Sequence, residues 1–162
     1  MKKFISILAI SAIILSFTTT ASANSFTNNN ITYIKFLDNG DYFETTLENI
    51  SESNPLSPFK ANTKTTKEIT KTKTIAYKTS EGKLLWDISI TATFTYNGST
   101  SKCILCSHNA KSYANSWNIK SVSSYKKDNY ATATAIVTHS GNSVNTLSKQ
   151  VTITCSKTGN VY

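Results

Sequence analysis

The stretch Leu84–Asn97 has the sequence LLWDISITATFTYN, and from Trp86 on it alternates between apolar and polar side chains. A period of two residues predicts a β-strand that buries one face and exposes the other, as in an antiparallel sheet. The strand should end at Asn97-Gly98, because both residues tolerate the positive φ of a tight turn. Its buried face is expected to carry Trp86, Ile88, Ile90, Ala92, Phe94 and Tyr96.

Shorter runs of the same kind, separated by turn residues, extend this pattern over the chain. The expected strands are 31–37, 42–48, 63–79, 84–97, 100–106, 117–125, 130–138 and 144–156. We expect a bulge in 63–79, because Lys71 and Lys73 share a face there with apolar residues. About eight short strands without a helical period predict an all-β antiparallel β-sandwich. Its core should include Trp86, Ile88, Ile90, Phe94, Trp117 and Ile153.

The first 23 residues are typical of a secretory signal peptide. Lys2 and Lys3 precede an apolar run, and Ala21-Ser22-Ala23 offers small residues for cleavage after Ala23. The run is shorter than the roughly 20 residues that span a bilayer, so no transmembrane segment is expected. We predict a secreted protein with a signal peptide (1–23), an N-terminal hairpin and proline-containing loop (24–62) and a main sandwich (63–162), the last two forming a single domain.

Charge is distributed unevenly in a chain whose formal net charge is +8. Residues 24–59 carry one lysine against five carboxylates, and residues 60–78 carry six lysines against one glutamate. One hypothesis is a cationic surface for an anionic cell-wall polymer, an acidic polysaccharide or a membrane surface. The alternative is that the two segments are neighbouring strands whose charges neutralise each other. Nucleic acid is disfavoured because the chain contains no arginine. The candidate ligand-binding residues are Lys60, Lys64, Lys67, Lys71, Lys73 and Lys78.

Three cysteines in an exported chain predict one disulfide and one free thiol. Cys103, Trp117 and Cys155 resemble the set found in immunoglobulin-like sandwiches, in which a tryptophan packs against a disulfide between the sheets. This resemblance implies a Cys103–Cys155 disulfide, a free Cys106 thiol and a sandwich that is immunoglobulin-like in general architecture. A Cys106–Cys155 disulfide is the alternative pairing.

Two further uses of the cysteines are less favoured. The spacing of Cys103 and Cys106 matches a redox motif, but no helix is expected there to activate a thiolate. Both cysteines, with His108 and either Cys155 or His139, have the donor types of a zinc site. Export normally oxidises such thiols first, so we predict no metal site.

Several segments resemble a group of small secreted proteins from Gram-positive bacteria. They are Asp38–Thr45, Gly82–Trp86 and Phe94–Gly98, together with Cys103, Trp117, Cys155 and Gly159. The resemblance covers nearly the whole mature chain, and Cys106 departs from the pattern. It implies export and a compact β-domain, and it implies no catalytic residues.

Candidate chemistry is sparse in this sequence. A hydrolase triad must use His108 or His139, because they are the only histidines. A glycosidase needs a pair of carboxylates, and Glu44 and Glu48 are a candidate pair because they share one face of an expected strand. Outward-facing tyrosines could stack on sugars. We therefore predict a non-catalytic, cofactor-free module that binds an anionic cell-surface or cell-wall component. The alternatives are a secreted antagonistic or membrane-active protein, similar to a toxin or bacteriocin, and a small secreted hydrolase. The tyrosines in question are Tyr33, Tyr42, Tyr113, Tyr125 and Tyr130.

Overall fold

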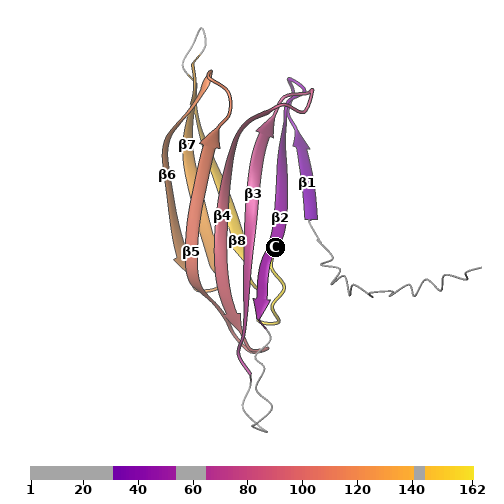
Figure 1. Cartoon of the computed structure of the whole chain (residues 1–162), viewed down its shortest axis with the longest axis vertical. Coiled ribbons are helices and arrows are strands. Elements are labelled where there is room, and N and C mark those ends of the chain that lie inside the picture. The colour runs from indigo at the N-terminus through magenta and orange to yellow at the C-terminus, as the bar shows by residue number, and fades with distance from the viewer. Residues whose placement is uncertain (1–30, 54–64, 141–144) are drawn as a thin grey trace, which may run out of the picture.

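The structure is a computed structural model, and it describes residues 31–53, 65–140 and 145–162. These residues form eight antiparallel strands in two sheets, which confirms the predicted all-β sandwich (Figure 1). In this part of the chain no helix is long and apolar enough to cross a membrane. The strands are β1 (Ile31–Phe36), β2 (Tyr42–Ser53), β3 (Lys67–Lys78), β4 (Leu84–Tyr96), β5 (Ser101–Ser112), β6 (Trp117–Lys127), β7 (Tyr130–His139) and β8 (Asn145–Thr154).

Within each sheet, the described strands pair in the order in which they follow one another in the sequence. The larger sheet has the order β1-β2-β3-β4-β5 and the smaller sheet has the order β6-β7-β8. The chain therefore passes from one sheet to the other once among these strands, between β5 and β6. The likeness to immunoglobulin domains is limited to the two packed layers, because those domains use Greek-key connections and this topology is a meander.

The core lies between the two sheets and is built on the alternation in β4. Trp86, Ile88, Ile90 and Phe94 are fully buried. They pack against β7, whose inward residues are mostly alanines. Small side chains on β7 leave room for the large ones on β4, which is how facing layers fill space without voids. Ile153 is also fully buried, whereas Trp117 is partly buried at the edge of the cluster.

Strand β5 is longer than the sequence predicts. Residues 107–112 continue the strand, and the register pairs His108 with Ile90 and Ala110 with Ile88. The sequence predicts a loop for this segment, because its residues are mostly Ser, His, Asn and Lys. Pairing with the buried strand β4 outweighs these low strand propensities.

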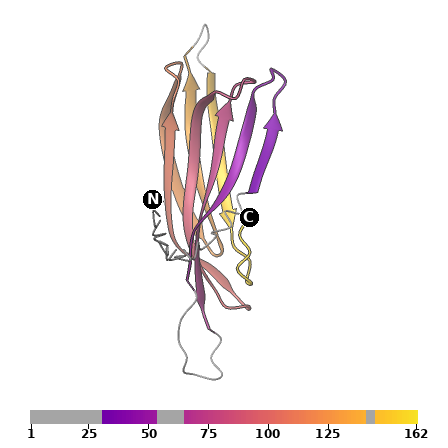
Figure 2. The ribbon, with the colours of Figure 1, turned by 45° about the vertical axis from the view of Figure 1, so that its right-hand side comes forward.

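The two long sides of the sandwich differ. On one side β5 and β6 lie next to each other, and the Lys126 ammonium donates a hydrogen bond to the Ile104 carbonyl across them at 2.5 Å. On the other side the larger sheet extends past β8, so that β1 has no strand of the smaller sheet facing it (Figures 1 and 2). We name these the closed side (β5 and β6) and the open side (β1, β2, β3 and β8).

Candidate functional site

The predicted lysines that the structure describes are on β3 and do not share one face of it. Lys71 and Lys73 face inward, in the same rows as the core residues Ala92 and Ile90. Lys78 is outside the sandwich, where its ammonium forms an ion pair with Glu44 on β2 at 2.8 Å. The single surface is therefore wrong for these residues. Lys67 is exposed at the start of β3, and Lys60 and Lys64 lie outside the described residues.

The bulge expected around Lys71 and Lys73 is not present in β3. The register between β3 and β4 is continuous from Lys67 to Tyr77. The two lysines remain inward because β3 lies at the open side, where their ammonium groups can reach solvent along the gap between the sheets. The alternative hypothesis places the acidic and basic segments on neighbouring strands, and β2 and β3 are such neighbours. Their charges do not all neutralise each other, because Lys71 and Lys73 face the opposite side of the sheet from Glu44 and Glu48.

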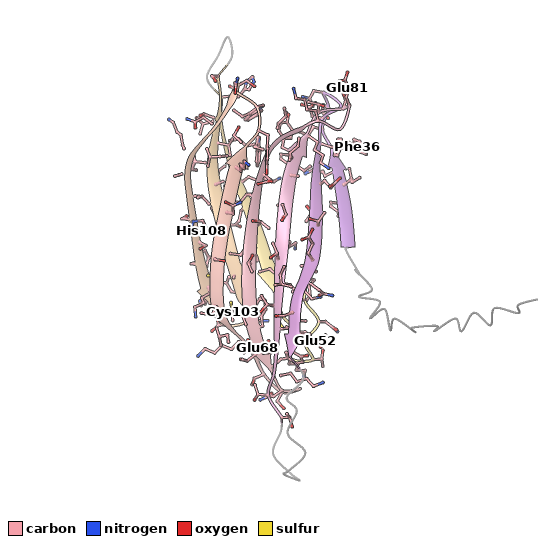
Figure 3. All side chains as sticks on the ribbon, in the orientation of Figure 1. Phe36, Glu52, Glu68, Glu81, Cys103 and His108 are labelled. Carbon is pink, nitrogen blue, oxygen red and sulfur yellow. The ribbon has the colours of Figure 1, made fainter. Side chains whose placement is uncertain are left out.

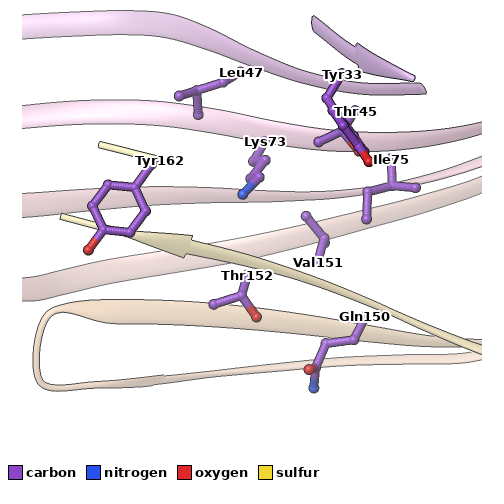
Figure 4. A pocket seen from close by; sticks show the side chains of 9 residues that line it. All are labelled: Tyr33, Thr45, Leu47, Lys73, Ile75, Gln150, Val151, Thr152 and Tyr162. Carbon is purple, nitrogen blue, oxygen red and sulfur yellow. The ribbon is translucent and has the colours of Figure 1, made fainter. Parts of the chain in front are cut away.

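A groove opens between the two sheets on the open side. It holds a cavity of about 490 Å³, within the range of about 300–1,000 Å³ that is typical of small-molecule sites. The larger sheet contributes residues from β1, β2 and β3, and the smaller sheet contributes β8 (Figure 4). The lining residues are Tyr33, Thr45, Leu47, Lys73, Ile75, Gln150, Val151, Thr152 and Tyr162.

Apolar and aromatic side chains line most of this groove. Leu47 and Val151 are buried and Ile75 is half-buried, so they form its floor. The rings of Tyr33 and Tyr162 line its rim and are 65% and 63% exposed. Two large aromatic side chains left uncovered beside an apolar floor are a feature of ligand sites.

Lys73 is the lysine among the residues that line the groove, and Lys149 and Lys35 lie elsewhere on the open side, on β8 and β1. The ammonium of Lys73 lies within the groove, as Figure 4 shows. The Lys149 ammonium on β8 lies 3.6 Å from the centroid of the Phe43 ring, a cation–π contact between the sheets. Burial lowers the pKa of Lys73, and burial followed by the positive charge of Lys35 lowers the pKa of Lys149. Both shifts mean that this environment disfavours the charged lysines.

Carboxylates do not offset these charges in the part of the chain that the structure describes. Its one ion pair is Lys78–Glu44, on the opposite face of the sheet. Asp41, just before β2, accepts a hydrogen bond from the Tyr77 hydroxyl at 2.5 Å, and Glu52, near the end of β2, accepts one from the Tyr96 hydroxyl at 3.2 Å. The groove is therefore cationic and apolar at once.

A second cavity, of about 430 Å³, lies at the end of β7, between His139 and the turn that joins β1 to β2. His139 lines it together with Asp41 and Ser116, the residue types of a hydrolase triad. Among the described residues no hydrogen bond joins these three side chains, and the His139 ring packs on Trp117 with centroids 4.6 Å apart. Asp41 is occupied by Tyr77 and Asn39, so this cavity lacks the connected acid, base and nucleophile of a triad.

The other histidine lies on the closed side (Figure 3). The His108 Nδ1 is 2.7 Å from the Ser124 hydroxyl, and this exposed pair links β5 to β6. No carboxylate hydrogen-bonds to His108 in residues 31–53, 65–140 and 145–162. The pair thus lacks the orienting acid that activates a serine.

The cysteines do not form the expected disulfide in this structure. All three are free, with Cys103 and Cys155 buried and Cys106 half-buried. The Cys103 thiol donates to the Leu105 carbonyl and the Cys155 thiol to the Ser156 carbonyl, each at 3.3 Å. Burial raises the pKa of both thiols to about 11, so they are held in the unreactive protonated form.

The immunoglobulin-like cluster is also absent. Trp117 begins β6 at the far end of the sandwich from the cysteines and packs against Tyr77 and Trp86, with ring centroids 5.3 and 6.1 Å away. The resemblance was misleading because spacing along the chain does not show at which end of a strand a residue lies. In the described ranges no group of three His, Cys, Asp or Glu side chains is placed to hold a metal ion.

The tyrosines considered for sugar stacking are dispersed over the molecule. Tyr125 and Tyr130 form an edge-to-face pair on β6 and β7 with ring centroids 6.1 Å apart, and Tyr113 donates a hydrogen bond to Asp87. Tyr33 belongs to the groove. They do not form one stacking surface.

Sequence reasoning missed Lys149 as an inward-facing lysine and Tyr162 as a member of the groove. A signal for Lys149 exists, because it shares the parity of Val151 and Ile153 and so was due to face inward. Tyr162 carried no such signal. The Tyr162 N–H bonds to the Thr154 carbonyl and thereby brings the C-terminal residues alongside β8.

Comparison with protein families places this chain in the SA0570-like family, whose profile matches residues 1–142. The matched residues include β1 to β7, and β8 lies beyond them. Comparison with curated proteins and comparison with solved structures each returned no match.

Proposed function

We propose that this SA0570-like protein is a secreted, non-catalytic module that binds an anionic component of a cell surface or cell wall. The observation that carries the proposal is the set of inward lysines on the open side, Lys71, Lys73 and Lys149, which have no carboxylate partner among the described residues. A half-buried cation without a partner is costly, and an anionic ligand relieves that cost on binding. The signal peptide expected at residues 1–23 would deliver the protein to the compartment that holds such a ligand.

The test is retention of the purified protein on isolated cell walls and on whole cells at low and high salt. We expect retention to fall as salt rises, because the screening length shortens from about 10 Å at 0.1 M to about 3 Å at 1 M. The triple variant Lys71→Gln, Lys73→Gln, Lys149→Gln should lose most of this retention.

A control variant separates the groove from net charge. Lys102, Lys111 and Lys120 are exposed lysines on β5 and β6, and changing all three to glutamine removes the same charge from the closed side. This variant should keep its retention. Equal loss in both triple variants, or no retention of the unmodified protein at any salt concentration, contradicts the proposal.

One observation favours membrane activity as the second candidate. The edge strand β1 exposes Ile34 and Phe36, the latter at 69%, next to Lys35. Apolar side chains beside a lysine suit the surface of an anionic bilayer. Dye release from vesicles of anionic phospholipid at low protein concentration would support this candidate, and intact vesicles would leave the binding module as the function.

A further inference from the structure

The groove on the open side is better suited to one kind of anion than to anionic polymers in general. A hydrated polyanion needs a row of exposed cations along its path. The ammonium of Lys73 instead lies among apolar side chains, with Leu47 as its register neighbour on β2 and Ile90 on β4. A polymer bound there would leave the apolar floor uncovered.

We infer that the groove between β3 and β8 binds a single-chain anionic amphiphile, with its acyl chain along Leu47, Ile75 and Val151 and its acidic headgroup at Lys73. This inference deepens the proposed function and rests on it, since it assigns the same lysines a ligand of defined chemistry. The apolar tail accounts for the floor of the groove, and the acidic headgroup accounts for the uncompensated charge. Neither a neutral lipid nor a small anion accounts for both.

Several parts of the structure agree with this assignment. The cavity of about 490 Å³ is large enough for a molecule of that class. The exposed rings of Tyr33 and Tyr162 lie at its rim, where they would cover the chain and lose contact with water. Lys149 and Lys35 lie near Phe43, further along the inner face of the larger sheet, and add positive potential to the open side.

The charge of Lys73 also gives the ligand an orientation, with the acidic headgroup at this residue. Polar groups of Thr45, Gln150 and Thr152 line the groove beside the apolar floor and can hydrogen-bond an acidic headgroup. An acid at Lys73 would gain charge-assisted hydrogen bonds in a partly desolvated site, where such bonds are stronger than in water.

The experiment uses 11-dansylamino-undecanoic acid, whose fluorescence rises when it leaves water. We expect a saturable rise with the unmodified protein, and displacement by laurate and by dodecyl phosphate. Dodecanol, which has the chain without the charge, and inorganic phosphate, which has the charge without the chain, should displace it at least about ten-fold less well. Equal displacement by dodecanol, or no saturable signal, would overturn the inference.

Two variants locate the binding. Lys73→Met keeps most of the length of the side chain and removes the charge, and it should weaken probe binding at least about ten-fold. Lys102→Met makes the same change at an exposed position on β5 and should bind as the unmodified protein does. Thermal denaturation of both variants shows that they fold, and equal probe binding by Lys73→Met and the unmodified protein would contradict the assignment.

Failure of this inference can be told apart from failure of the proposed function. Retention on cell walls that depends on the inward lysines, without binding of the probe, would keep the surface role and discard the amphiphile. Binding of the probe without retention would discard the surface role and keep the groove. Vesicles of anionic phospholipid form a further arm, because binding only to intact bilayers would show that the lysines bind a membrane surface and not a single chain.

Discussion

The closed and open sides of this sandwich are built from the same kinds of strand and differ in what covers the inner face. On the closed side β5 and β6 meet, and polar contacts such as His108–Ser124 link them. On the open side the larger sheet is two strands wider, so inward residues of β1 to β3 face a groove. Inward-facing residues of the larger sheet thus form the core where β7 covers them, and line a ligand-sized cavity where the sheet extends past β8. A difference in sheet width is enough to turn structural residues into candidate binding residues.

The largest expected effect compares two isoleucines on neighbouring strands. Ile90→Ala on β4 removes a fully buried side chain and should lower the free energy of unfolding by about 3–4 kcal/mol. Ile75→Ala on β3 makes the same change in the groove wall, and should cost about 1–2 kcal/mol because water can occupy the space. Urea denaturation measures both, and equal costs would show that the open side is packed like the core.

A smaller difference is expected at two glycines near the end of β4. Gly98 and Gly159 have φ of 83° and 90°, which favour glycine at both positions. A Cβ on Gly159 would lie 2.4 Å from the Tyr96 ring, whereas one on Gly98 would meet no atom within 4 Å. Gly98→Ala should cost about 1 kcal/mol and Gly159→Ala about 2–4 kcal/mol, as measured by urea denaturation. Equal costs would mean that the C-terminal residues do not pack on β4.

Lys73→Met should separate stability from binding on the open side. It removes a half-buried charge without a carboxylate partner, so the melting temperature should stay the same or rise slightly while probe binding falls. Lys102→Met on the closed side should change neither. A clear loss of melting temperature in Lys73→Met would show that this lysine has a structural role.

The smallest effect concerns thiol reactivity. In the folded protein at pH 9, Cys106 should react with iodoacetamide before Cys103 and Cys155, whose pKa of about 11 keeps them protonated. Unfolding without a reductant should expose all three thiols, and mass spectrometry should count three labels per chain. One label would contradict the free thiols and would reinstate the disulfide that the sequence suggests.

The sequence predicted what depends on local pattern. Alternation in β4 identified the strand on which the core is built and four of its fully buried residues, Trp86, Ile88, Ile90 and Phe94. The inward face of Lys71 and Lys73 was also visible in the pattern of β3. This pattern predicts a bulge, because a charged lysine is not expected on the buried face of a strand. The prediction is wrong because β3 lies beside the groove, where an inward lysine can reach solvent.

The groove could not be predicted because it depends on how far one sheet extends past the other. Leu47 and Val151 are far apart in the sequence and come together only because β2 and β8 lie at the same side of the sandwich. Likewise, the spacing of Cys103, Trp117 and Cys155 suggested a cluster, but the twelve-residue strand β5 carries the chain from Cys103 to the other end of the molecule, where Trp117 lies. Residue spacing carries no information on such three-dimensional placement.

The most direct test is a titration of the ¹⁵N-labelled protein with laurate, followed through backbone amide resonances. The account predicts that the shifts map to the open side, at Thr45, Leu47, Lys73 and Val151, and that the amides of β5 and β6 stay unchanged. Shifts confined to the closed side, or spread evenly over both sheets, would contradict the claim that the uncovered face of the larger sheet is the binding site.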